Sequence, residues 1–180
     1  MPTFRDTDED TAELRKATQE LIYAVNYSEY NLIVKHHVVD TNKEEIYINS
    51  PDNEKVSEQF TGMDFMAVAD AVVTDYSSII YEALLKNLPI YIYCFDSDKY
   101  LDERGFYIDF WNDIPAAYSK NAQGIIEEIV YKNSVSAEIT EQFKKDYVNK
   151  KFPSIAKVYG EIIDELIKGT YDNRYNYKDV

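Results

Sequence analysis

The chain has 180 residues, of which 45% are hydrophobic and 29% charged, as in a folded globular domain with its own core. Its formal net charge of −14 argues against nucleic-acid binding, which needs a basic face, and against attachment of this segment alone to an anionic membrane. The single cysteine excludes a disulfide framework. Together with the absence of an expected signal peptide and of a long apolar run, it favours a cytoplasmic location.

Hydrophobic periodicity predicts helices and strands that alternate along the chain. In the first predicted helix, Leu14, Leu21 and Val25 recur at helical spacing, and the acids at positions 8–10 suit the positive end of a helix. The predicted elements, in chain order, are a helix over 9–26, strands over 32–34 and 46–48, a helix over 63–69, a strand over 71–73, a helix over 77–86, a strand over 90–94, and C-terminal helices over 121–132, 137–149 and 154–168, before a tail at 169–180.

This alternation, with strands that are continuously apolar, is typical of a parallel sheet covered on both faces. We therefore predict an α/β fold, a Rossmann-like doubly wound parallel sheet, in one domain over 1–180. Such sheets bind ligands beyond the carboxyl ends of their strands. The segment Pro2–Arg5 reads like the loop after a strand, although only Met1 stands before it, so a first strand is expected to be missing.

A polar stretch, Thr74-Asp75-Tyr76-Ser77-Ser78, stands where a predicted strand gives way to a predicted helix. The first backbone N–H groups of a helix have no partner within it, and the helix dipole is positive there. The hydroxyls of Ser77 and Ser78 can cap those groups or join them in holding a phosphate. Glu82 lies one turn further on and could accept hydrogen bonds from ribose hydroxyls. From these residues alone, an ordinary helix cap and a phosphate site both stay open.

Residues 70–107, DAVVTDYSSIIYEALLKNLPIYIYCFDSDKYLDERGFY, resemble the C-terminal signature of the CDP-glycerol glycerophosphotransferase family, the teichoic-acid primases and polymerases of Gram-positive bacteria. That signature joins an apolar strand, T-D-Y-S-S, an acid-bearing helix, a strand led by proline and an R-G-F/Y motif. Pro2–Asp6 and the strand ending Lys35-His36-His37 also resemble the family pattern. The three segments follow the family order.

The resemblance implies a GT-B architecture, of which this chain would be the C-terminal, nucleotide-donor-binding half, with no counterpart of the N-terminal acceptor domain. It implies transfer of glycerol phosphate from a CDP-glycerol or related CDP-alcohol donor to a polyol-phosphate polymer of the teichoic-acid type, with release of CMP. The full-length family would work in the cytoplasm, peripheral on the inner face of the membrane, without a cofactor or metal. The fragment alone is expected to be inactive.

The resemblance also assigns roles to residues that match the family motifs. They are His37 as the catalytic residue, Ser77, Ser78, Arg5 and Arg104 as donor phosphate-binding residues, and Glu82, Thr74 and Asp75 as ribose- or nucleotide-binding residues. The choice of His37 over His36 follows the spacing of the motif. The family more often has Asp at the position of Glu82.

Simpler roles compete with several of these assignments. Arg104 could pair with a neighbouring acid in a solvated turn. The aromatic side chains of Tyr100, Phe106 and Trp111 could pack in the core instead of stacking on cytosine. Asp96 and Asp98 resemble a metal pair but lack further ligands. Residues 114–117, Ile-Pro-Ala-Ala, replace a Pro-Gly-Pro-like segment of the family, which leaves the alcohol of the donor open.

Two alternative functions also stay open. One is a GT-B glycosyltransferase domain that uses a nucleotide sugar and shares the phosphate site at the helix start. The other is a non-catalytic Rossmann-like binding module.

Overall fold

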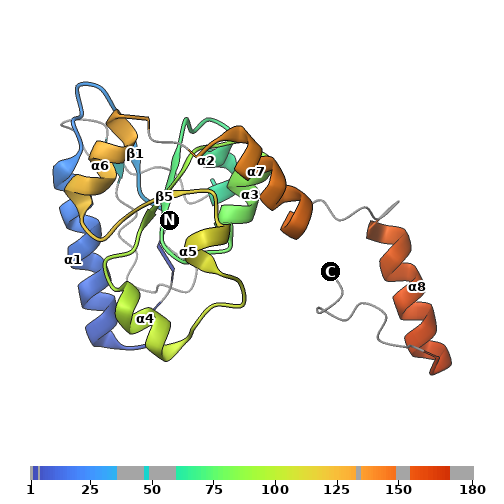
Figure 1. The fold of residues 1–180 in the computed structure, drawn as a ribbon. Helices are drawn as coiled ribbons and strands as arrows, with labels where there is room; N and C mark the ends of the chain where they lie inside the picture. The colour runs from blue at the N-terminus through green and yellow to red at the C-terminus, as the bar shows by residue number, and fades with distance from the viewer. Residues whose placement is uncertain are drawn as a thin grey trace. The chain divides into compact units, whose positions relative to one another are not determined.

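The computed structural model describes residues 2–3, 5–35, 47–48, 60–132, 135–148 and 155–170. The chain divides into two compact units, Met1–Thr140 and Glu141–Val180. A single donor-binding domain over 1–180 stays a prediction. Figure 1 shows the elements. In chain order they are α1 (Asp8–Ala24), β1 (Leu32–Ile33), β2 (Tyr47–Ile48), α2 (Gly62–Met66), β3 (Val72–Thr74), α3 (Ile79–Leu85), β4 (Ile90–Tyr93), α4 (Ser97–Glu103), α5 (Phe110–Asp113), β5 (Ala117–Ser119), α6 (Ala122–Val130), α7 (Ala137–Phe143), the π-helical η1 (Lys144–Val148) and α8 (Ile155–Lys168).

A three-stranded parallel sheet forms the centre of the first unit. Its strand order is β3-β4-β5, with Val72 opposite Ile90 and Ile92 opposite Tyr118. All four residues of β4 are buried, as expected for the middle strand of a sheet that is covered on both faces. The predicted α/β class and parallel sheet are confirmed.

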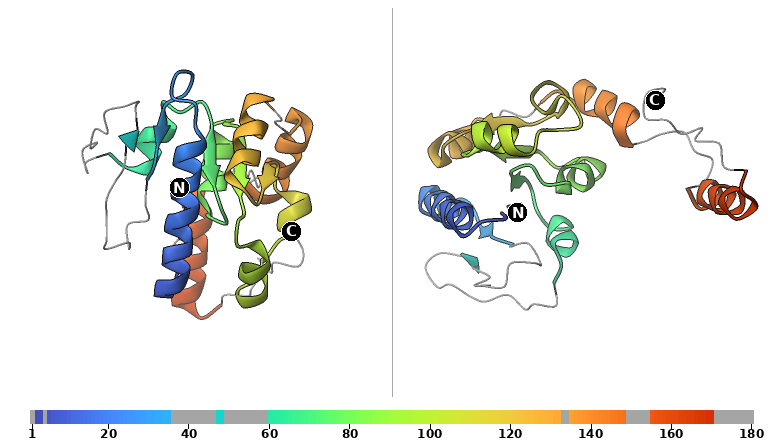
Figure 2. Two further views of the ribbon diagram at one scale, coloured as in Figure 1. Left: turned by 90° about the vertical axis from the view of Figure 1, so that its left-hand side faces the viewer. Right: turned by 90° about the horizontal axis from the view of Figure 1, so that it is seen from below.

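Helices cover both faces of this sheet. On one face, residues of α1 and α6, among them Leu21 and Ile125, pack against Tyr91 and Tyr93 of β4. Because side chains alternate along a strand, Ile92 points to the opposite face, where α3 contacts β3 and β4. Figures 1 and 2 show α1 and α6 on one side of the strands and α3 on the other. This arrangement confirms the predicted doubly wound layering.

Local signals explain where α1 begins and where α3 ends. At the start of α1, the hydroxyl of Thr7 accepts a hydrogen bond from the backbone N–H of Asp10, and three acids occupy the first turn. At the end of α3, Asn87 adopts a left-handed backbone with φ 58°, which stops the helix. The predicted end of this helix at residue 86 agrees with its C-cap, Lys86.

The structure differs from the prediction at the short elements. β1 pairs antiparallel with β2 and, within the described residues, lies outside the three-stranded sheet. Sequence analysis did not predict α4, α5 and β5, because they show neither the apolar run of β3 nor the repeated apolar spacing of α3. Of the described helices, none is long and apolar enough to cross a membrane.

Candidate functional site

A buried cluster of charged and polar side chains lies at the carboxyl ends of β3 and β4. We call Thr3, Arg5, Asp75, Tyr76 and Asp96 the Arg5 cluster. Asp75 follows the last residue of β3, and its carboxylate accepts hydrogen bonds from the backbone N–H of Thr3 at 2.8 and 2.9 Å and from the Thr3 hydroxyl at 2.5 Å. The N-terminal segment is thereby fixed to the turn that follows β3.

The guanidinium of Arg5 is the centre of this cluster. It donates from Nε to Asp96 at 2.9 Å, from Nη2 to Asp75 at 3.1 Å and from Nη1 to the backbone carbonyl of Thr3 at 2.9 Å. Arg5 is only 6% exposed. Burial by itself would lower the pKa of Arg5, but the two carboxylates raise it above its ordinary value. The guanidinium therefore stays charged and paired inside the protein.

Tyr76 connects the Arg5 cluster to a group of aromatic rings. Its hydroxyl donates to Asp96 at 3.0 Å, and its ring stacks on Tyr100 with centroids 3.9 Å apart. Phe106 and Phe110 stack on each other beside it, with centroids 4.3 Å apart. Burial, together with the nearby Asp96 carboxylate, raises the pKa of Tyr76 far above its ordinary value. Tyr100 and Phe106 thus pack within the protein, as the simpler interpretation has it.

The residues that follow Tyr76 form a polar surface at the start of α3. We call Ser77, Ser78 and Glu82 the α3 entrance. Within the described part of the chain, the exposed Ser78 makes no side-chain capping hydrogen bond, and the half-buried Ser77 accepts a long one, 3.4 Å, from the backbone N–H of Ile79. The Oε2 atom of Glu82 is buried and has no hydrogen-bond partner among the described residues. A buried carboxylate oxygen without a partner is costly, so a ligand donor would be favoured there.

Two of the other predicted site residues, Thr74 and Arg104, lie outside the α3 entrance. Thr74, at the end of β3, is only 3% exposed. Arg104 directly follows α4, pairs with Asp6 and lies 5.7 Å from the ring centroid of Tyr100. Phosphate contacts by Arg5 and Arg104 stay predictions, although both guanidinium groups have carboxylate partners in the protein. His37 lies outside the described residues.

The two acids that resemble a metal pair have separate partners. Asp96 belongs to the Arg5 cluster, whereas Asp98 pairs with Lys120 at 2.9 Å. Among the residues that the structure describes, no group of three metal-ligating side chains occurs.

The segment Ile-Pro-Ala-Ala at 114–117 is mostly buried. Ile114 and Ala116 are 5% and 7% exposed, and Pro115 is also buried. These side chains therefore fill the interior before β5, and the departure from the family pattern need not alter the contacts to a donor.

Sequence reasoning missed the partners of the Arg5 cluster. Thr3, Tyr76 and Asp96 were not assigned to any shared group, although a buried arginine requires carboxylates near it. The available signal was the position of Asp75 and Asp96 directly beyond two neighbouring parallel strands, whose ends meet at one edge of the sheet.

The chain is similar to known proteins of one family. The family model described as CDP-Glycerol:Poly(glycerophosphate) glycerophosphotransferase matches residues 1–156. The teichoic acid ribitol-phosphate primase of Bacillus spizizenii is 29% identical over 180 residues, which are 95% of this chain and 44% of that protein. The teichoic acid glycerol-phosphate primase of Bacillus subtilis is 32% identical over 128 residues, 71% of this chain and 33% of that protein. The chain thus spans less than half the length of these curated relatives.

A solved structure is also similar. The wall teichoic acid polymerase TagF has 23% sequence identity and a TM-score of 0.44 over 59% of this chain and 27% of that chain.

Proposed function

We infer the function from one premise: this chain belongs to the CDP-glycerol:poly(glycerophosphate) glycerophosphotransferase family. We propose that it is the donor-binding half of such an enzyme, the C-terminal half of a GT-B fold. The complete enzyme would transfer glycerol phosphate from CDP-glycerol to a hydroxyl at the end of a teichoic-acid-type polymer and release CMP. The second GT-B domain and the inner face of the membrane would supply the acceptor.

The observation that carries this proposal is the set of polar atoms at the α3 entrance whose hydrogen bonds are weak or missing among the described residues. Ser77 and Ser78 offer two hydroxyls that are weakly engaged or free of capping bonds, beside backbone N–H groups at a helix start. Glu82 adds an acceptor oxygen without a partner among the described residues. Donors for phosphate oxygens and an acceptor for a ribose hydroxyl are what a CDP-linked donor requires.

We assign Arg5 a positioning role. Its guanidinium is paired with Asp75 and Asp96, so it holds the turn that leads from β3 to Ser77. A fixed turn keeps the two serine hydroxyls in one geometry, which lowers the entropy that a ligand must remove on binding.

The reaction needs further groups besides this surface. The acceptor oxygen attacks the phosphorus next to glycerol, the bond from that phosphorus to the bridging oxygen breaks, and CMP leaves with the bonding electron pair. Negative charge grows on the leaving phosphate, so donors at the α3 entrance would stabilise it. We propose His37 as the catalytic residue and Arg104 as a further phosphate partner; the base that removes the acceptor proton would come from the acceptor domain.

The most detailed part of the proposal is the identity of the alcohol in the CDP-linked donor. One relative is named a ribitol-phosphate primase and another a glycerol-phosphate primase. Both names contain a polyol phosphate, so we propose a CDP-alcohol as the class of donor for this chain. We propose CDP-glycerol first, because the matching family model bears that name.

Titration calorimetry on the chain with CDP-glycerol, CDP-ribitol and a UDP-sugar tests this function. We expect binding of a CDP-alcohol, weakened about 10- to 100-fold when Ser77 and Ser78 are both replaced by alanine, with unfolding free energy changed by less than about 0.5 kcal/mol. Ser136 is a matched control, because its hydroxyl accepts from the backbone N–H of Ile139 at the same 3.4 Å. Ser136→Ala should leave binding unchanged.

The same titrations separate the alternatives. Tighter binding of the UDP-sugar than of either CDP-alcohol would favour the glycosyltransferase domain. If no nucleotide binds, and the serine variants melt like the parent chain with and without CDP-glycerol, a non-catalytic module is the better description.

A further inference from the structure

The first unit contains a small pocket of about 300 Å³ beyond the carboxyl ends of β4 and β5. We call it the α4–α5 pocket, because α4 and α5 supply part of its lining. The residues that line it include Cys94, Asp98, Leu101, Trp111, Tyr118 and Lys120. These six residues belong neither to the Arg5 cluster nor to the α3 entrance, so the proposed function leaves the pocket without a role.

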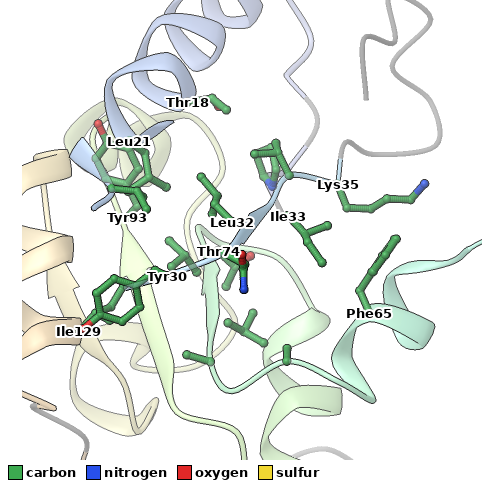
Figure 3. A pocket seen from close by; sticks show the side chains of 18 of the residues that line it. Thr18, Leu21, Tyr30, Leu32, Ile33, Lys35, Phe65, Thr74, Tyr93 and Ile129 are labelled. Atoms are coloured by element: carbon green, nitrogen blue, oxygen red, sulfur yellow. The ribbon is translucent and has the colours of Figure 1, made fainter. Parts of the chain in front are cut away.

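A larger cavity of the same unit lies on the other face of the sheet. It has a volume of about 470 Å³, and Figure 3 shows its labelled lining residues, among them Thr74 and Tyr93. Because Thr74 and Asp75 line it, this cavity borders the proposed donor site. Side chains alternate along a strand, so Tyr93 points away from the face of Ile92, and Tyr118 lies opposite Ile92. The larger cavity and the α4–α5 pocket are therefore separate.

The α4–α5 pocket lies on the same face of the sheet as the α3 entrance. Tyr118 shares the face of Ile92, which is the face that α3 covers. The ring of Trp111 contacts Phe110 with centroids 5.3 Å apart, and Phe110 contacts Tyr76 with centroids 5.7 Å apart. Tyr76 directly precedes Ser77 in the sequence. Two ring contacts therefore connect the pocket to the α3 entrance, and a molecule in it would be a neighbour of the donor.

The apolar part of the α4–α5 pocket is open to water. Trp111 is 37% exposed and Leu101 is 47% exposed. Large apolar side chains at a concave surface gain free energy when a ligand covers them. A ligand that fits this wall has C–H groups on one side.

The polar part of the pocket is a pair of opposite charges. The ammonium of Lys120 donates to both carboxylate oxygens of Asp98, each at 2.9 Å. Because the two charges cancel, the pair does not favour a ligand with a net charge. The two side chains are 58% and 91% exposed. An ammonium has three N–H donors and a carboxylate about four acceptor positions, so both groups keep sites for a ligand that donates and accepts.

We propose that the α4–α5 pocket binds one uncharged, hydroxyl-bearing unit of the acceptor, either a sugar ring or a polyol. Such a unit has C–H groups for the ring of Trp111, and its hydroxyls can accept from Lys120 and donate to Asp98. Small-molecule sites occupy about 300 to 1,000 Å³, so a pocket at the lower limit suits a single unit. The source of this unit, the acceptor, rests on the proposed function.

The acceptor is a better source than the alcohol of the donor. That alcohol is bonded to a phosphate which the proposed function places at Ser77 and Ser78, and two ring contacts separate Tyr76 from Trp111. Transfer also requires an acceptor that is held beside the donor. A unit bound in the α4–α5 pocket would fix the acceptor on this half of the enzyme, in addition to contacts with the second domain.

The fluorescence of Trp111 tests the proposal directly, because this is the single tryptophan of the sequence. The chain is titrated with ribitol and with methyl glucoside, and cyclohexanol, an apolar ring with one hydroxyl, is the control. We expect a saturable change with Kd of roughly 1 mM for at least one polyhydroxylated probe and much weaker binding of cyclohexanol. The proposal is wrong if neither probe gives a saturable change, or if cyclohexanol binds as tightly.

A double variant tests whether the charged pair recognises the ligand. Asp98→Ala with Lys120→Ala removes an exposed pair, so Tm should change little while Kd for the probes rises about 10-fold. The matched control is Lys157→Ala with Glu161→Ala, an exposed pair of α8 at 3.9 Å, which should leave Kd unchanged. Equal Kd in the pocket variant and the parent chain would contradict recognition by Asp98 and Lys120.

A glycerol-phosphate oligomer and CDP-glycerol identify the source of the unit. We expect the oligomer to change Trp111 fluorescence in the parent chain, with about 10-fold weaker binding to the pocket variant, and CDP-glycerol to bind both proteins equally. If the oligomer does not bind, or if the variant weakens CDP-glycerol but not CMP, the assignment to the acceptor is wrong. If the oligomer binds and CDP-glycerol binds neither protein, the result counts only against the proposed donor site.

Discussion

The Arg5 cluster and the α3 entrance lie next to each other in the sequence and have opposite physical character. Asp75 and Tyr76 have their polar atoms engaged by Thr3, Arg5 and Asp96. One and two residues later, Ser77 and Ser78 keep hydroxyls that are weakly engaged or free of capping bonds. Glu82 even buries an oxygen that has no partner in the described part of the chain.

This difference separates structural residues from those available to a ligand within one motif. Groups whose hydrogen bonds are complete inside the protein gain nothing from a ligand, whereas an incomplete set gains the bonds that it lacks. Within T-D-Y-S-S, Asp75 and Tyr76 therefore fix the turn, and the two serines that follow keep hydroxyls for a ligand. Three sets of substitutions can break or sharpen this distinction.

The largest expected effect is the loss of stability when Arg5 is replaced. Arg104, the other arginine that the sequence assigns to phosphate, serves as the comparison. Arg5→Ala leaves two buried carboxylates without their cation, so the unfolding free energy should fall by about 3 to 5 kcal/mol. Arg104→Ala removes a partly exposed pair and should cost less than about 1 kcal/mol. Urea unfolding monitored by circular dichroism measures both. Similar losses for the two variants would contradict a distinct, closed Arg5 cluster.

The next effect concerns Glu82, where stability and binding should change in opposite directions. Glu82→Met removes the oxygen that lacks a partner, so the unfolding free energy should rise by about 0.5 to 1 kcal/mol while CDP-glycerol affinity falls about 10-fold. Thermal melting and titration calorimetry report the two quantities.

Glu82→Asp is the matched control for this substitution, because it keeps the carboxylate and shortens its reach. It should bind CDP-glycerol within a few-fold of the parent chain. A Glu82→Met protein that melts lower and binds as before would show that this oxygen has a protein or solvent partner in solution.

The smallest expected effect concerns Tyr93, whose buried side chain lies on the face of the sheet that α1 and α6 cover. Burial and the nearby Glu20 carboxylate raise the pKa of Tyr93 to about 12, from an ordinary value of 10.0. A raised folded-state pKa contributes stability that is complete below about pH 10 and is lost as the pH rises toward 12.

Between about pH 9 and 10.5 this loss should be under about 1 kcal/mol and should be smaller still in Tyr93→Phe. Urea unfolding at several pH values measures it, and absorbance at 295 nm follows tyrosine ionisation. If the parent and the Phe variant lose stability in parallel, Tyr93 does not carry this dependence.

The layered fold and the position of the α3 entrance could be predicted from the sequence. The apolar stretch before Thr74, the helical spacing after Ser77 and the stop at Asn87 are local signals, and local signals do not depend on the rest of the chain. The alternation of helices and strands then indicated a parallel sheet, which the structure confirms for β3, β4 and β5.

The Arg5 cluster could not be predicted in the same way. Its contacts join residues 70 and 91 positions apart, and no periodicity reports a pairing over such a distance. The sequence therefore offered Arg5 as a free cation for phosphate, while the fold supplies it with carboxylates. The short elements β5 and α5 escaped prediction for a different reason, since neither has the apolar run that marks the three-residue strand β3.

The distance along the chain between Arg5 and Asp96 also matters during synthesis on the ribosome. At about 5 to 20 residues per second, the 91 residues between them take roughly 5 to 18 seconds to appear. During that interval the arginine has been made but its second carboxylate has not. The first unit can therefore close only after β4 has left the exit tunnel, and a nascent chain shorter than this should remain a substrate for chaperones.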